Sequence, residues 1–187
     1  MINLIVIAAL TLSGATEIPE NFLLHEKRAR TVLPENVAAE EWWKVSDKLD
    51  RQLELKPCKG KRPTDDGRVA MRTVVQGTSA PSGMVEQLVI YKSPGTAQKA
   101  LKRLRAEVLR CHKGYALRRS AIGDESFRVI NKIYSYEEGQ RYTYDGMSGY
   151  VVRRGRALMI YLADDHSVAG DAKKMAKKVC DLPEVCV

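Results

Sequence analysis

An aspartate, a glutamate and a serine stand side by side at positions 124–126, within the stretch AIGDESFRVI. Carboxyl and hydroxyl groups supply nucleophiles, general acids and general bases, so this triplet is the first candidate for catalysis. A serine nucleophile requires a base within hydrogen-bond reach, and in serine hydrolases of the α/β type a glycine follows two residues after the serine. Here that position is Arg128, and the flanking residues predict a strand on each side.

A turn explains the same residues. Gly123 gives the backbone freedom, and Asp124 can accept hydrogen bonds from nearby amides. Neighbouring residues of a strand point to opposite faces, so Asp124 and Glu125 cannot flank a sugar ring as glycosidase carboxyls do. We therefore expect a structural turn at a strand entrance and no catalytic residues. A small hydrolase that uses Asp124, Glu125 or Ser126 is the alternative.

Other residues capable of chemistry are few. His25, His112 and His166 are the only histidines, and His166 follows Asp164 and Asp165 where a helix is expected to begin. Helix capping explains acidic residues at such a position. The sequence has no Walker loop, dinucleotide-binding fingerprint or HExxH motif. We accordingly predict no metal, no cofactor and no enzymatic activity.

Tyrosines are concentrated in one region: six of the eight lie between positions 134 and 161, among arginines and lysines. On neighbouring strands they would form an aromatic, basic face able to bind a sugar, a lipid head group or an anionic polymer. Ordinary cross-strand packing is the alternative explanation. The predicted ligand-binding residues are Tyr134, Tyr136, Tyr142, Tyr144, Arg141 and Arg153.

Apolar periodicity and turn residues predict the elements that position these groups. Trp42, Val45, Leu49 and Leu53 recur at helical spacing, which predicts a helix from Pro34 that ends at Lys56-Pro57-Cys58. A hairpin (68–76 and 84–92) and a helix capped by Thr96 follow, then a strand meander and a last helix (168–180). The meander strands are 115–120, 127–136, 141–144, 149–153 and 156–163, with turns at 138–139, 145–146 and 154–155. This order indicates a single-domain α+β fold, a twisted antiparallel β-sheet with helices packed on one side.

The four cysteines form no CxxC pair, which argues against a zinc or thioredoxin-like motif. Of the three connectivities that four cysteines allow, we prefer Cys58–Cys111 with Cys180–Cys186, because Pro183 helps the chain turn between the last two. Two disulfides indicate an oxidising compartment, and so a secreted or cell-envelope protein. The net charge of +8 favours anionic surfaces, while export argues against nucleic acid as a partner.

The N-terminal residues 2–12 are apolar, and Ser13-Gly14-Ala15 after them resembles a small-residue cleavage site. The run is too short to span a bilayer, and no basic residue precedes it. We expect residues 1–15 to be an export segment or a buried N-terminal element, residues 16–187 to be the domain, and no transmembrane span.

Several short motifs occur in a characteristic order. They are EIPENF at 17–22, QLVIY at 87–91 with the helix start at 93–100, Arg110-Cys111, IGDES at 122–126, YVVRRG at 150–155 and the closing helix into Cys180. In this order and spacing, residues 15–187 resemble the extracellular sensor domain of PknH-type actinobacterial receptor kinases and related secreted proteins and lipoproteins.

The resemblance implies an α+β fold with a twisted antiparallel sheet, disulfides, an extracellular ligand-binding cleft and no enzymatic activity. It also implies that residues 123–126 are a structural hallmark at a strand entrance. Because this sequence shows no kinase domain, transmembrane helix or lipobox cysteine, we do not expect signalling through an attached kinase. We expect a non-catalytic, exported, sensor-like domain that binds an envelope-derived ligand or a partner protein. A charge-driven binder of anionic envelope polymer is a further alternative.

Overall fold

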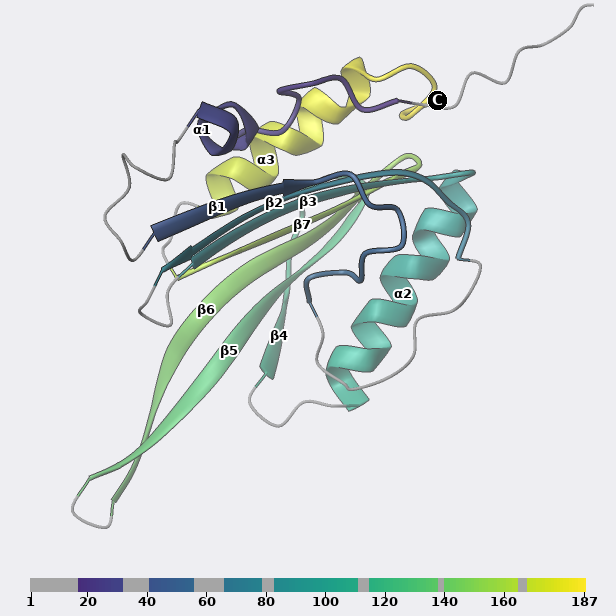
Figure 1. The fold of residues 1–187 in the computed structure, drawn as a ribbon. Helices are drawn as coiled ribbons and strands as arrows, with labels where there is room; N and C mark the ends of the chain where they lie inside the picture. Colours follow the sequence, from purple (N-terminus) through teal and green to yellow (C-terminus); the bar gives the residue numbers. More distant parts are fainter. Residues whose placement is uncertain are drawn as a thin grey trace, which may run out of the picture.

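The structure is a computed structural model that describes residues 17–31, 41–55, 66–78, 83–110, 115–137, 140–164 and 168–187, without the side chains of 133–137 and 141–145. The elements are α1 (Glu26–Thr31), β1 (Glu41–Ser46), β2 (Arg68–Thr78), β3 (Gly83–Tyr91), α2 (Pro94–Arg110), β4 (Tyr115–Arg119), β5 (Glu125–Glu137), β6 (Gln140–Arg154), β7 (Ala157–Ala163) and α3 (Val168–Lys178). Figure 1 shows one sheet between helices.

Seven strands form a single antiparallel sheet in the order β1-β2-β3-β7-β6-β5-β4. β2 and β3 form the predicted hairpin. β4, β5, β6 and β7 form the predicted meander, and β7 joins it to the hairpin by pairing with β3. The prediction of an α+β fold built on one antiparallel sheet is therefore confirmed.

Helices cover both faces of the sheet, so the prediction of helices on one side is wrong. α1 and α3 lie on the face that carries Leu88 and Met159, and α2 lies on the face that carries Val89 and Leu158. All seven residues of β7 are buried. A strand buried on both sides needs a covering layer on each, and the unbroken apolar run ALMIYLA is the sequence signal for this.

The helix predicted from Pro34 to Lys56 is wrong in its described part, where β1 is an edge strand of the sheet. Trp42 is 52% exposed, and its indole lies over Gly77, where an added Cβ would approach the ring to 2.2 Å. Two tryptophans and a valine within six residues favour a strand. The strand forms because β1 pairs with β2 in an antiparallel ladder. The spacing of apolar residues along the chain does not indicate this pairing.

The α2 helix begins three residues earlier than predicted. Ser93, not Thr96, is its cap, because the Thr96 N–H donates to Ser93 Oγ at 3.2 Å and Pro94 takes the first helical position. The spacing of Ala97, Ala100, Leu101, Leu104 and Val108 in the sequence predicts the buried face of this helix, and four of these five residues are buried. They are Ala97, Leu101, Leu104 and Val108, while Ala100 is half-buried.

Two predicted turns have different outcomes. Gly155, with φ of +53°, lies in the tight turn between β6 and β7, as predicted. Asp145 and Gly146, predicted as a turn, lie inside β6 near a shift in register between Ile130 and Lys132 of β5. The β5–β6 ladder accommodates this shift in register as it would a β-bulge. The strands predicted at 141–144 and 149–153 are therefore parts of one strand, β6.

At the C-terminus, α3 passes into a 3₁₀ turn, η2 (Val179–Asp181). Cys180 and Cys186 form a disulfide with their Cα atoms 5.2 Å apart, which confirms that predicted bond. Cys58 and Cys111 lie outside the described residues, as do residues 1–15. None of the described helices has the length and apolar character needed to cross a bilayer.

Candidate functional site

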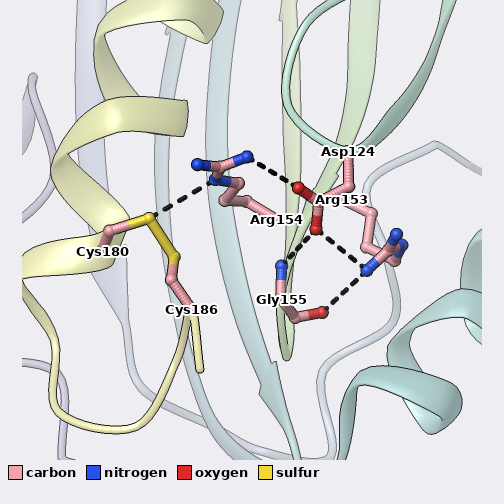
Figure 2. The surroundings of a disulfide bond; sticks show 6 residues. All are labelled: Asp124, Arg153, Arg154, Gly155, Cys180 and Cys186. Atoms are coloured by element: carbon pink, nitrogen blue, oxygen red, sulfur yellow. Dashed lines mark hydrogen bonds and ion pairs between the residues drawn. A yellow bond between two sulfur atoms is a disulfide. The ribbon is translucent and has the colours of Figure 1, made fainter.

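Residues 123–126 form the expected turn, in which Asp124 joins the entrance of β5 to the β6–β7 connection (Figure 2). Gly123 has a φ of +68°, and a Cβ there would lie 2.6 Å from the Arg153 carbonyl oxygen. The Asp124 carboxylate accepts hydrogen bonds from the Gly155 amide at 2.7 Å, from Arg154 at 2.7 Å and from Arg153 at 3.1 Å. These contacts give the motif a structural role.

Two arginines and the Gly155 amide stabilise the charged form of the Asp124 carboxylate. Burial acts to raise the pKa of Asp124, but the Gly155 hydrogen bond and the two arginines outweigh it, so the pKa is lowered. Arg154 also extends the cluster to the disulfide, since its Nε donates to Cys180 Sγ at 3.5 Å (Figure 2). Asp124 therefore ties the strand entrance, the β6–β7 turn and the C-terminal loop together.

Ser126 is not placed for nucleophilic catalysis. Its Oγ accepts a hydrogen bond from the Ile122 N–H at 3.0 Å, and no histidine in the described part of the chain is hydrogen-bonded to it. Glu125 is engaged by Gln98 and Arg153. Within the same described residues, no three His, Cys, Asp or Glu side chains gather as a metal site. The geometry favours the structural interpretation over the hydrolase alternative.

A pocket of about 270 Å³ lies between the α1 segment, α3 and the sheet. Its volume is close to the lower end of the range of roughly 300–1,000 Å³ that is usual for small-molecule sites. The segment before α1, α1 itself and α3 form its wall, and β1, β2, β3 and β7 form its floor. The lining side chains with a polar group or a ring are His25, Arg28, Trp43, Gln76, Tyr161, Asp164 and Asp171.

Glu41, the first residue of β1, holds the floor of the pocket. Its Oε1 accepts hydrogen bonds from Trp43 Nε1 and Gln76 Nε2, both at 2.7 Å. Trp43 and Gln76 are directly opposite each other in the β1–β2 ladder. The guanidinium of Arg28 lies 5.3 Å from the centre of the Trp43 ring, within cation–π distance. Side chains fixed in this way need little further ordering when a ligand binds.

Glu86 holds the wall of the pocket. Its carboxylate, which is 0% exposed, accepts hydrogen bonds from the backbone N–H groups of Leu24 and His25 at 2.8 and 2.9 Å. The Tyr161 hydroxyl donates to the same carboxylate at 2.6 Å. His25 in turn lies 2.9 Å from Asp171 of α3 through its Nε2. One buried acid thus places His25 at the pocket.

Burial raises the pKa of Glu86, and its hydrogen bonds from Tyr161, His25 and Leu24 oppose this shift without cancelling it. Burial also raises the pKa of Tyr161 well above its usual value, and the neighbouring Glu86 carboxylate acts in the same direction. The Tyr161 hydroxyl therefore keeps its proton and remains a hydrogen-bond donor throughout the neutral range.

A second buried acid, Glu26, fastens α1 itself to the sheet. Its carboxylate lies 3.1 Å from Arg72 of β2 and 2.9 Å from Arg30, and it accepts a hydrogen bond from the Leu23 N–H at 3.2 Å. Arg72 also forms a two-bond pair with Asp47, at 2.6 and 3.1 Å. The α1 segment is consequently held to β3 through Glu86 and to β2 through the Glu26–Arg72 ion pair.

The predicted tyrosine face lies on an arm of the sheet. β5 and β6 continue to pair with each other as far as Glu137 and Gln140, and the hairpin projects beyond the other strands (Figure 1). The register places Tyr136 opposite Arg141. Tyr134, Tyr142 and Tyr144 belong to the same arm, and the side chains of all five residues lie outside the described part of the structure.

Arg153, the sixth predicted ligand-binding residue, is not brought together with the tyrosines. It lies twelve residues after Arg141 along β6, which is about 40 Å at the usual rise of a strand. Its guanidinium contacts Asp124, Glu125 and the Gly155 carbonyl oxygen. Its charge is therefore used within the fold.

The pocket could not be identified from the sequence because its parts are distant along the chain. His25 and Asp171 are 146 residues apart, and Trp43 meets Gln76 only through the β1–β2 register. The EWW run at 41–43 is the available signal, but the spacing of Trp42, Val45 and Leu49 predicts a helix there. A strand assignment would have put one tryptophan on each side of the sheet.

Comparisons with known proteins give a likeness of fold. No protein-family model matches this chain, and no curated protein matches it. Among solved structures, the chain is similar to the extracellular domain of PknH from Mycobacterium tuberculosis, with a TM-score of 0.50 and 12% sequence identity. The match covers 90% of this chain and 97% of that domain. The resemblance inferred from the motifs is thus supported at the level of the fold.

Proposed function

We propose that this chain is a non-catalytic extracellular domain that binds a small, envelope-derived ligand in the pocket between α1, α3 and the sheet. The observation that carries the proposal is the pocket floor, where Glu41 fixes both Trp43 and Gln76. The fold shared with an extracellular domain and the Cys180–Cys186 disulfide support a location outside the cytoplasm.

The lining of the pocket suits a small polar molecule. It offers a flat aromatic ring, an amide, one guanidinium and two carboxylates, supplied by Trp43, Gln76, Arg28, Asp164 and Asp171. Such a mixture can pair with hydroxyl, amide and charged groups at once, while the ring covers an apolar side. A molecule of the size of a sugar or an amino acid fits these groups and the volume.

The arm of β5 and β6 is a second contact surface in this proposal, for a partner protein or an anionic surface. Its projection beyond the sheet supports this role (Figure 1). Tyr136→Ala combined with Arg141→Ala removes an aromatic and a cation that are directly opposite each other. If this double variant binds every identified partner as the unchanged protein does, the arm is not the contact surface.

Ligand binding is tested by equilibrating the purified protein with the small-molecule fraction of a cell-envelope extract. The protein is then separated by gel filtration and denatured, and the released compounds are identified by mass spectrometry. We expect Arg28→Ala and Asp171→Asn to lose a compound that the unchanged protein retains. Arg28 is well suited because its side chain is 66% exposed, so its removal should cost little stability.

Lys99→Ala is the matched control. Lys99 is exposed on α2, on the other face of the sheet, and its replacement also removes one positive charge. The control should retain the compound. Equal retention by the control and by both pocket variants, or no compound enriched over buffer, would exclude the pocket as the ligand site.

A further inference from the structure

Arg118 of β4 and Arg128 of β5 are directly opposite each other in the sheet. Side chains at such positions share a face, with Cβ atoms about 4.5–5.5 Å apart, and like charges placed this way are destabilising. Arg128 is also directly opposite Tyr150 of β6. The three residues therefore form a row across three strands, with two cations as neighbours.

The row lies on the face of the sheet that carries α1 and α3. Phe127 and Val129, on either side of Arg128, pack in the core under α2, whereas Tyr150 packs against the core under α3. α3 lies over β6 and β7, and no described helix covers β4 and β5 on this face (Figure 1). Arg118 is exposed, and Arg128 and Tyr150 are half-buried, so the row can be reached from solvent.

No acid balances the two arginines within the described residues. Neither guanidinium forms an ion pair or a hydrogen bond there, and the Nε of Arg128 is buried without a partner. The nearest positions on the same face, two residues along each strand, carry no charge. They are Ala116, Ser126, Ile130, Ser148 and Val152.

Three other arginines of this sheet have carboxylate partners, although the buried Nε atoms of Arg68 and Arg153 make no hydrogen bond either. Arg68 is paired with Asp66, Arg72 with Glu26 and Asp47, and Arg153 with Asp124 and Glu125. Arg118 and Arg128 have no carboxylate partner among the described residues, so the partly desolvated charge of Arg128 lacks the compensation that such a charge normally requires. An acceptor with negative charge, placed between the two guanidiniums, would supply it.

We propose that Arg118 and Arg128 form a binding site for a phosphate group, carried either by a soluble ester or by a lipid head group. Phosphate oxygens can accept from the terminal nitrogens of both guanidiniums, and the charge of the phosphate removes the repulsion between the arginines. Tyr150 lies beside Arg128 as a further donor. This site is separate from the pocket under α1 and α3, so the proposal stands apart from the proposed function.

The test uses inorganic phosphate, with sodium chloride at equal ionic strength as the reference. Phosphate should raise the thermal unfolding midpoint and bind in calorimetric titration. Arg118→Met and Arg128→Met should each weaken that binding by about tenfold or more. Without phosphate, Arg128→Met should be at least as stable as the unchanged protein, because it removes the repulsion. If Arg128→Met fails to fold, phosphate binding by Arg118→Met still tests the site, because Arg118 is exposed and its replacement should leave the fold intact.

Arg119→Met is the matched control. Arg119 is exposed in the same strand and carries the same charge, but it is opposite Phe127 and so belongs to the other face. It should leave phosphate binding within about twofold of the unchanged protein. Equal losses in Arg119→Met and Arg118→Met would overturn the site, because they would show a response to overall charge.

A vesicle experiment separates the two sources of phosphate. Vesicles of phosphatidylglycerol and phosphatidylcholine are compared with vesicles of phosphatidylcholine alone in a flotation assay. Binding of inorganic phosphate without retention on the anionic vesicles identifies a soluble ester. Retention that Arg118→Met abolishes and Arg119→Met preserves identifies a lipid head group. Absence of both effects in the unchanged protein refutes the proposal.

Discussion

Replacement of Glu86 by glutamine tests how the pocket wall is held. In the native protein, one carboxylate oxygen accepts from Leu24 N–H and the Tyr161 hydroxyl, and the other accepts from His25 N–H. Glutamine keeps the shape but replaces one oxygen by an NH₂ group, which only donates. Whichever way the amide turns, at least one backbone N–H then faces another donor.

The magnitude follows from the burial of Glu86, which is 0% exposed. A buried donor without an acceptor costs about 1–3 kcal/mol. Removing the buried charge offsets part of that cost, so we expect the free energy of unfolding to fall by about 1–2 kcal/mol. For a chain of this length, the melting temperature should fall by roughly 2–8 °C.

Urea unfolding followed by tryptophan fluorescence measures this change. Glu20→Gln is the control, because its side chain is 71% exposed and its ion pair with Arg30 is long, at 3.8 Å; it should change stability by less than about 0.5 kcal/mol. Hydrogen exchange at Leu24 and His25 should quicken in Glu86→Gln. Equal stability of the two variants, with exchange unchanged at both amides, would refute this account of the pocket wall.

Three further predictions concern stability towards urea, and a fourth concerns the pH dependence of folding. Gly155→Ala should lower the free energy of unfolding by about 3 kcal/mol or more, because an added Cβ would lie 1.8 Å from a carbonyl oxygen at positive φ. Gly170→Ala, in α3 with nothing within 4 Å, should raise it by about 0.5–1 kcal/mol. Cys180→Ser with Cys186→Ser should lower it by about 2 kcal/mol, the value for closing so short a loop. Urea unfolding measures all three. Because the pKa of Asp124 is lowered on folding, its contribution is present above the unfolded pKa and is lost as pH falls through the folded pKa. Acid unfolding followed by circular dichroism should therefore show Asp124→Asn to be less sensitive to low pH than the unchanged protein.

Local signals explain what could be predicted from the sequence. The β2–β3 hairpin, the buried face of α2 and the turn at Gly155 each depend on residues that are close along the chain. The role of Asp124 was predicted for the same reason, since Gly123 and the flanking strands indicate a turn. The partners Arg153 and Arg154, however, come from a strand that the turn residues do not reveal.

Distant contacts explain what could not be predicted. The spacing of apolar residues along the chain predicts a helix at β1. The pairing of β1 with β2, which makes it a strand, leaves no signal in that spacing. A buried glutamate is unfavourable inside a strand unless hydrogen-bond donors surround its carboxylate. For Glu86 these donors include the Leu24 and His25 amides, which are 62 and 61 residues away along the chain. The pocket depends on both of these features, so its position emerges only when the fold is complete.

The most direct test of an extracellular role is the state of Cys180 and Cys186 in the native protein. Cells and medium are quenched in acid, free thiols are alkylated, and the linked peptides are measured by mass spectrometry. We predict that the chain is recovered from the medium or envelope, with Cys180 joined to Cys186 and neither alkylated. A chain recovered from the cytoplasm with both residues alkylated would contradict the central claim of an exported binding domain.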